Sequence, residues 1–209
     1  QTGVVQFFGG GVLDGAFTTT IASARIDFIG GTYTHYGGGA PVVSGAGMTR
    51  LTGGTFQLHD TIPNFQFVGG TVVLLPDFQA GGAITNLTVD GATLNGTNLV
   101  TGTLRWRAGT FNGALTVASN GLFIIEGSAD KTLNAAVTNW GTIQLSGSGN
   151  FHIYANNGAR LENLGTFDLS GDQDLYGQGG TPVLRNTGLL RKTAGTGNAR
   201  VGVSGSWPI

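Results

Sequence analysis

Apolar and polar residues alternate along short segments of the chain, and no segment shows the spacing of an amphipathic helix. The alternation is clearest in residues 142–146, 151–154 and 166–170. These segments are rich in β-branched and aromatic residues, and each ends at a turn that contains Gly, Asn, Asp or Ser. The pattern predicts many short β-strands, each with one side buried and the other facing solvent.

One short phrase recurs in the C-terminal half: Asn-x-Gly, followed by Thr or Leu and then a large apolar residue. It occupies residues 139–143, 163–167 and 186–190, so that its glycines are spaced by 24 and 23 residues. A looser version without the Asn begins at Gly31, Gly54, Gly70 and Gly91. Repetition over such distances is typical of solenoids, propellers and arrays. Since three short strands and three turns fit into one repeat, we predict an all-β fold, a parallel β-helix (β-solenoid) with coils of about 20–24 residues.

In such a fold each residue stacks on its equivalent one coil away, so that columns of similar residues are expected. We expect the threonines after the glycines to form one outward column, and the apolar residues that follow them to face the interior. Asn139, Asn163 and Asn186 are expected to stack at a corner, in left-handed backbone geometry, with their amides forming a ladder. The sequence leaves the register between Gly91 and Gly121 open. The expected threonine column consists of Thr32, Thr55, Thr71, Thr142 and Thr166.

Composition limits the classes of partner. The 209 residues include 39 glycines and no cysteine, 10% are charged, and the formal net charge is −1. A balance so close to zero predicts no binding to nucleic acid. No apolar run reaches the roughly 18 residues of a membrane helix, so we predict no membrane insertion. Because the chain has no cysteine, it can form neither disulfides nor thiolate metal sites.

The whole chain, residues 1–209, is expected to form one β-solenoid domain and to be a segment of a longer array. Residues 1–84 carry less regular repeats, and residues 85–203 carry clearer ones. Open ends of a solenoid expose unpaired strand edges, so end-to-end self-association is also expected.

Residues 104–113, the Asn-x-Gly corners and residues 190–197 are similar to the glycine-rich parallel β-helix repeat regions of large bacterial secreted and surface proteins. The chain resembles filamentous-haemagglutinin-like or autotransporter-type adhesins over roughly residues 85–203. This resemblance implies a right-handed β-helix that is secreted or on the cell surface. It also implies a structural or adhesive role, as a rigid stalk or filament element that can meet a host or cell-surface ligand.

The alternative function is that of a carbohydrate-active β-helix, either a polysaccharide-binding module or, less favoured, a polysaccharide lyase or hydrolase. Exposed aromatic rings stack on sugar rings, and the candidates are Trp140 at a corner and Tyr154 with His152 on one strand; Tyr36 is a weaker one. Arg105 and Arg107 project together from another strand as candidate basic groups, whereas Trp106 is expected to be buried. An enzyme is not the favoured interpretation.

Metal binding has one candidate. Asp168, Asp172 and Asp174 form the only cluster of carboxylates in the sequence, and calcium prefers several oxygen ligands from one turn. An ordinary turn rich in aspartate is the alternative, and no other cofactor is expected. The three histidines, His35, His59 and His152, lie in unrelated segments and are predicted to face solvent from strands.

Overall fold

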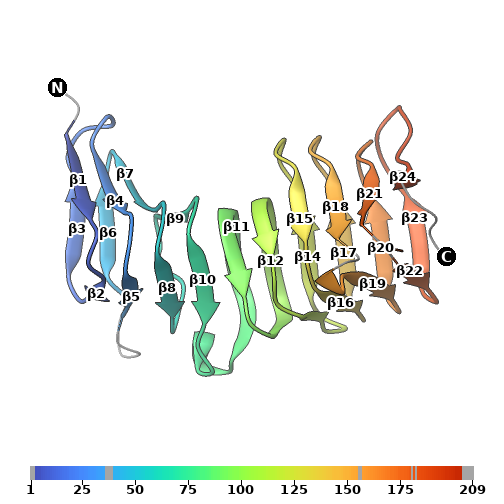
Figure 1. Cartoon of the computed structure of the whole chain (residues 1–209), viewed down its shortest axis with the longest axis horizontal. Helices are drawn as coiled ribbons and strands as arrows, with labels where there is room; N and C mark the ends of the chain where they lie inside the picture. The colour runs from blue at the N-terminus through green and yellow to red at the C-terminus, as the bar shows by residue number, and fades with distance from the viewer. Residues whose placement is uncertain (1–2, 36–39, 155–156, 180, 182, 204–209) are drawn as a thin grey trace.

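The computed structural model describes residues 3–35, 40–154, 157–179, 181 and 183–203. These residues form an all-β solenoid of about nine coils, in which parallel strands stack from one end of an elongated body to the other (Figure 1). The strands pair in parallel along the whole body, and helical structure is limited to short 3₁₀ turns such as η1 (Phe78–Ala80). The predicted β-solenoid is therefore confirmed.

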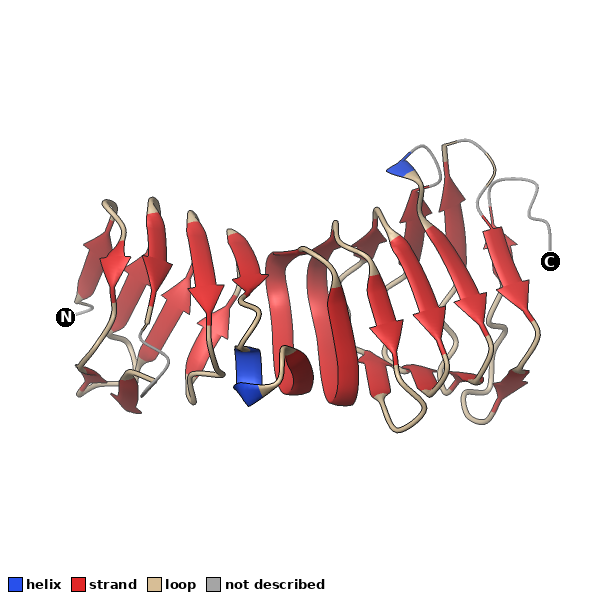
Figure 2. Cartoon of the chain, turned by 90° about the horizontal axis from the view of Figure 1, so that it is seen from below, coloured by secondary structure: helices blue, strands red, loops and turns tan. Residues whose placement is uncertain are grey.

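Each coil contributes to three faces. The first face is built from β1 (Val4–Phe7), β4 (Arg25–Phe28), β7 (Met48–Leu51), β9 (Phe65–Phe67), the middle parts of β11 and β12, β14 (Leu122–Ile125), β17 (Thr142–Leu145), β20 (Thr166–Leu169) and β23 (Leu189–Lys192). The long strands β11 (Ala83–Asn95) and β12 (Asn98–Phe111) each continue around all three faces (Figure 2).

The other two faces repeat the same stacking. The second face is built from β2 (Gly11–Val12), β5 (Thr32–Thr34), β8 (Thr55–Leu58), β10 (Thr71–Leu74), the ends of β11 and β12, β15 (Lys131–Leu133), β18 (Phe151–Tyr154), β21 (Leu175–Gln178) and β24 (Val201–Val203). The third face is built from β3 (Ala16–Thr19), β6 (Val42–Gly45), the starts of β11 and β12, β13 (Leu115–Val117), β16 (Ala136–Asn139), β19 (Arg160–Asn163) and β22 (Val183–Asn186).

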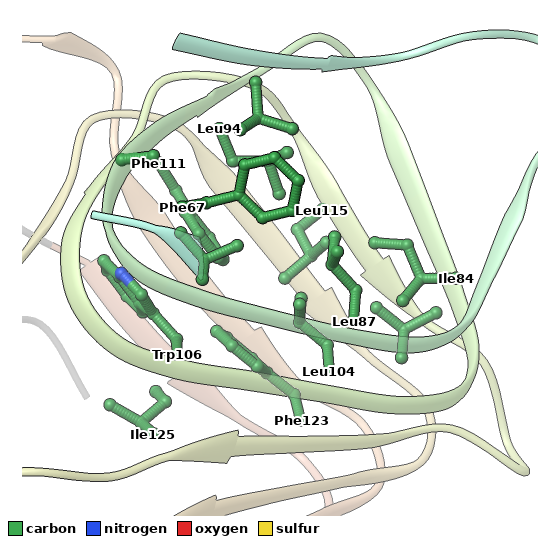
Figure 3. Packing of buried hydrophobic residues seen from close by; sticks show 14 of the residues in the cluster. Phe67, Ile84, Leu87, Leu94, Leu104, Trp106, Phe111, Leu115, Phe123 and Ile125 are labelled. Atoms are coloured by element: carbon green, nitrogen blue, oxygen red, sulfur yellow. The ribbon is translucent and has the colours of Figure 1, made fainter. Parts of the chain in front are cut away.

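The interior is filled by the alternate residues that the sequence pattern assigned to it. Trp106 is fully buried, as predicted, and its ring stacks on Phe111 with 4.1 Å between centroids and lies beside Phe123 (Figure 3). Stacked and edge-on aromatic pairs of this kind add to the free energy gained by burying their area. The core therefore runs along the axis as a continuous apolar column.

The expected single threonine column is wrong, because it joins two columns on different faces. On the second face, Thr32, Thr55 and Thr71 are aligned in register, and the column continues through Thr93 and neighbours further along. Those neighbours are Thr110, Thr132, His152 and Tyr176. By contrast, Thr142 and Thr166 are aligned with each other on the first face. The Gly-Thr phrase is local, and two different corners of the coil use it.

The asparagine ladder is confirmed, but its expected left-handed backbone is wrong. Asn139, Asn163 and Asn186 lie at the ends of β16, β19 and β22, with their side chains directed into the corner. None of them is among the described non-glycine residues with positive φ. The glycines that follow are needed for close approach instead, since a Cβ on Gly165 would overlap the carbonyl oxygen of Gly141.

Coil length is less uniform than expected, and the variation is greatest near the middle. Only 16 residues separate Thr55 from its partner Thr71, because residues 59–64 cross the third face without a strand. The next coil is longer and carries the loop that contains η1. The first-face ladder ends at β9 and does not continue from β9 to β11 in the described residues, although β10 and β11 remain paired on the second face. Most of the segment from Gly91 to Gly121, whose register the sequence left open, lies in β11 and β12, and these two strands pair with three register shifts.

Candidate functional site

The predicted aromatic residues do not form one platform. Trp140 is 55% exposed at the corner between β16 and β17, where the third face meets the first. Tyr154 is half-buried at the end of β18 on the second face. These two side chains therefore occupy different corners of the solenoid. Tyr36, the weaker candidate, lies outside the described residues.

His152 has an aromatic neighbour that sequence reasoning missed. The ring of Tyr176, aligned with His152 one coil later, stacks on the imidazole with 5.1 Å between centroids and 23° between planes. The Nε2 atom of His152 lies 3.2 Å from Asp130 Oδ2. Since each ring covers one face of the other, this pair offers less flat surface to a sugar than a single exposed ring. The spacing of 24 residues from His152 to Tyr176 was the signal that could have found it.

Arg105 and Arg107 share one carboxylate on the neighbouring coil. Arg105 Nη1 donates to Glu126 Oε2, and Arg107 Nε donates to Glu126 Oε1, each at 3.0 Å. Glu126 follows β14, which is aligned with β12, and sequence reasoning did not single it out. The two arginines thus hold adjacent coils together, and Arg107 also borders a groove on the first face.

The three aspartates of the predicted calcium site each bind a cationic side chain of the last coil. Asp168 accepts from Arg191 at 3.0 Å, and the other two pairs are Asp172 with Lys192 at 2.7 Å and Asp174 with Arg200 at 2.6 Å. Hydrogen bonds from Lys192 and Arg200 lower the pKa of Asp172 and of Asp174, respectively. Within the described part of the chain, no group of three or more His, Asp or Glu side chains is arranged to hold a metal ion. Calcium binding here stays a prediction.

These pairs belong to a pattern that covers the molecule. In the described residues, each ion pair of 3.2 Å or less joins one coil to the next, as between Asp27 and Arg50 and between Glu162 and Arg185. The same holds for the pairs centred on Glu126, Asp168, Asp172 and Asp174, and the contacts of Asp77 with His59 and of Asp130 with His152 also join successive coils. Although the chain has few charges, most of its carboxylates contact a basic side chain of a neighbouring coil.

The three histidines were predicted to face solvent, and this is wrong for His35, which is buried. Two of the three, His35 and His59, lie side by side. The rings of His35 and His59 meet edge to face at 5.6 Å, and His59 Nδ1 lies 2.6 Å from Asp77 Oδ2. The hydrogen bond from His59 lowers the pKa of Asp77. A hollow of about 430 Å³ opens beside this pair, between the short coil and the η1 loop.

Gln79 connects the η1 loop to the start of β11 through its side chain. Its φ of 50° lies in the left-handed region, which is costly for a residue with a side chain. Its Oε1 accepts from the amide of Thr85 at 2.6 Å, and its Nε2 donates to the carbonyl of Asn86 at 2.8 Å. The side chain thereby supplies the start of β11 with hydrogen bonds.

A groove of about 380 Å³ lies on the first face, where the ladder is interrupted between β9 and β11. Its polar lining comes from Asn64, Gln66, Thr88, Asp90 and Arg107, and Met48 adds an apolar edge. A second hollow shares Phe65, Phe67 and Thr88 with this groove and borders the same interruption. Sequence reasoning placed Arg107 as a candidate but missed the other lining residues, because they converge only through stacking.

Comparison of the chain with protein-family models, with curated proteins and with solved structures found no match. No helix in the described ranges is long and apolar enough to cross a membrane.

Proposed function

We propose that the chain is a structural module of an extracellular or cell-surface bacterial protein, a rigid β-solenoid stalk that displays or adheres. The observation that carries this proposal is the use of charge: the close ion pairs of the described residues connect successive coils. A catalytic carboxylate needs an environment that shifts its pKa for proton transfer at working pH. The pKa values of Asp77, Asp172 and Asp174 are instead lowered by hydrogen bonds from histidine or cationic partners, and that of Asp130 is lowered mainly by the backbone amide of Asn150, which suits a structural contact.

The interior supports the same function. Stability of a solenoid accumulates from contacts between neighbouring repeats, and here each coil meets the next through backbone ladders, apolar columns and ion pairs. The buried asparagine ladder adds side-chain hydrogen bonds along one corner. A body joined in this way resists bending and transmits force along its axis.

Antibodies against the purified chain provide the test. On intact source cells we expect them to label the surface as strongly as after permeabilisation, and pulling on the chain between its ends should unfold it coil by coil. Labelling that requires permeabilisation would contradict a surface location. Release of products from a polysaccharide by the purified chain would replace the stalk with an enzyme.

End-to-end self-association is part of this proposal. Val5 and Phe7 occupy inward positions in β1, aligned with Ile26 and Phe28, yet they are 54% and 38% exposed because no described coil of this chain covers β1. Exposed apolar positions at an open strand edge favour contact with another solenoid end. Sedimentation velocity over a range of concentrations should show association that Phe7→Glu weakens; a monomer at every concentration would refute this part of the proposal.

A further inference from the structure

The groove at the interruption between β9 and β11 has a chemistry that the stalk function does not use. We propose that it is a binding site for a neutral, linear polysaccharide lying along the solenoid axis. This inference goes beyond the structural role, because a stalk needs no groove and would remain a stalk without a ligand.

The direction of the groove follows from the coils that line it. The lining residues come from four successive coils: Met48 lies on β7, Gln66 on β9, Thr88 on β11 and Arg107 on β12. With neighbouring strands about 4.8 Å apart, three steps between coils span roughly 14 Å. The groove thus crosses the strands and runs along the axis, which suits a linear polymer.

The lining favours hydroxyl groups over charged groups. Gln66 and Thr88 present an amide and a hydroxyl group, which both donate and accept hydrogen bonds. Asn64 adds a further amide, whose Nδ2 also donates to the carbonyl of Val43 at 3.0 Å. Asp90 is exposed and forms no ion pair among the residues that the structure describes, whereas Arg107 is held by Glu126. One carboxylate and one guanidinium leave no strong excess of either sign, so a neutral ligand with many hydroxyls fits better than an acidic one.

Geometry argues against an inserted peptide strand. The interruption would need the width of a whole extra strand, about 4.8 Å beyond normal spacing, to admit one. However, β10 and β11 stay paired in register on the second face. At the adjoining corner a Cβ on Gly91 would lie only 2.5 Å from the carbonyl oxygen of Val68, so the two coils are in contact there. The opening therefore accommodates side-chain contacts with a ligand on the surface.

The irregular coil explains why the site lies here. The 16-residue coil is shorter than the next coil, which contains the η1 loop. The first-face ladder is interrupted between these two coils. Positions where the regular pattern fails in an otherwise consistent fold are where functional sites are expected. The groove is the polar hollow that this interruption leaves on the first face.

Affinity gel electrophoresis of the purified chain in gels containing a soluble neutral glucan, mannan or galactan tests the proposal. The double variant Gln66→Ala/Thr88→Ala and the single variant Asp90→Asn remove lining groups. Gln144→Ala is the matched control, because Gln144 has the same outward position on the first face outside the groove. We expect at least one neutral polysaccharide to retard the wild type and Gln144→Ala, with at least tenfold weaker binding by both groove variants.

Several outcomes would overturn the proposal: no retardation by any neutral polysaccharide, equal retardation of the groove variants, or retardation only by an acidic polygalacturonate. Loss of binding in Trp140→Ala with the groove variants unchanged would move the site to the corner. Competition by extended peptides alone would assign the groove to a different class of ligand. Thermal unfolding checks that each variant is folded, and if the double variant is not, amide shifts of the wild-type chain on adding the polysaccharide must cluster at Gln66, Thr88 and Asp90.

Discussion

Asn139 and Asn163 lie one coil apart at the same corner, and the amide Nδ2 of Asn139 donates to the side-chain Oδ1 of Asn163 at 2.7 Å. Asn163 repeats the contact with Asn186 at 2.6 Å. Asn139 and Asn163 are fully buried, and each also donates to a backbone carbonyl of the following coil, that of Thr166 or of Leu189. The ladder therefore satisfies polar groups that would otherwise be costly in the interior.

Asn163→Ala tests the energy of this ladder. It leaves the buried amide of Asn139 and the half-buried amide of Asn186 without their partner, so we expect the free energy of unfolding to fall by about 2–4 kcal/mol. Urea denaturation followed by circular dichroism measures the change. Asn134→Ala is the control, because Asn134 forms a similar ladder with Asn112 and Asn157, but these hydrogen bonds are exposed on the outside of the solenoid. A loss as large for Asn134 as for Asn163 would mean that burial is not the cause.

The end of the ladder at Asn139 offers a second test. Asn139 Oδ1 is buried without a hydrogen-bond partner, and the residue aligned with Asn139 one coil earlier is Val117. Val117→Asn would place an amide donor next to this oxygen. Val100→Asn, one coil further away, buries an amide beside an apolar residue instead. We expect Val100→Asn to lower stability by about 2–3 kcal/mol and Val117→Asn to cost clearly less in the same urea titration; equal losses would contradict the inferred geometry.

Gly165 is predicted to tolerate no side chain. A Cβ there would overlap the backbone of Trp140 and Gly141 on the preceding coil, although the backbone of Gly165 is not left-handed. Forcing the coils apart should cost at least about 1–3 kcal/mol. The comparison is Gly81→Ala, because a Cβ on Gly81 would meet no atom within 4 Å. Thermal unfolding should show a lower midpoint for Gly165→Ala and little change for Gly81→Ala.

The last coil should loosen in acid. The hydrogen bond from Arg200 lowers the pKa of Asp174, and that from Lys192 lowers the pKa of Asp172. Each contact therefore contributes its full stability above the ordinary aspartate pKa of about 3.9, and loses it as the pH falls through the lowered value. Carbon-detected NMR titration should place both carboxyl midpoints below the ordinary value. In Arg200→Ala the midpoint of Asp174 should rise while that of Asp172 stays in place; no rise would mean that Arg200 is not the cause.

Local pattern was enough to predict the strands, the solenoid and the asparagine ladder. Strict alternation places Ile143 and Phe167 inside, and a residue type that recurs at coil spacing, such as Asn139 and Asn163, must meet itself in a stacked fold. By contrast, the polar lining of the groove could not be predicted. Gln66, Thr88 and Asp90 follow no repeat and come together because one coil is short.

Alternation, turns at glycines and stacking of coil on coil could all be predicted from the order of residues, because these properties depend on neighbouring residues and on a repeat distance. Which corners lie above one another depends on how the coils pack in three dimensions. Thr71 continues to Thr93 on the second face, whereas Thr142 belongs to the first, because successive coils differ in length and the offsets accumulate along the axis. The same unequal coils interrupt the first-face ladder and open the groove, a consequence of packing that no single segment of the sequence contains.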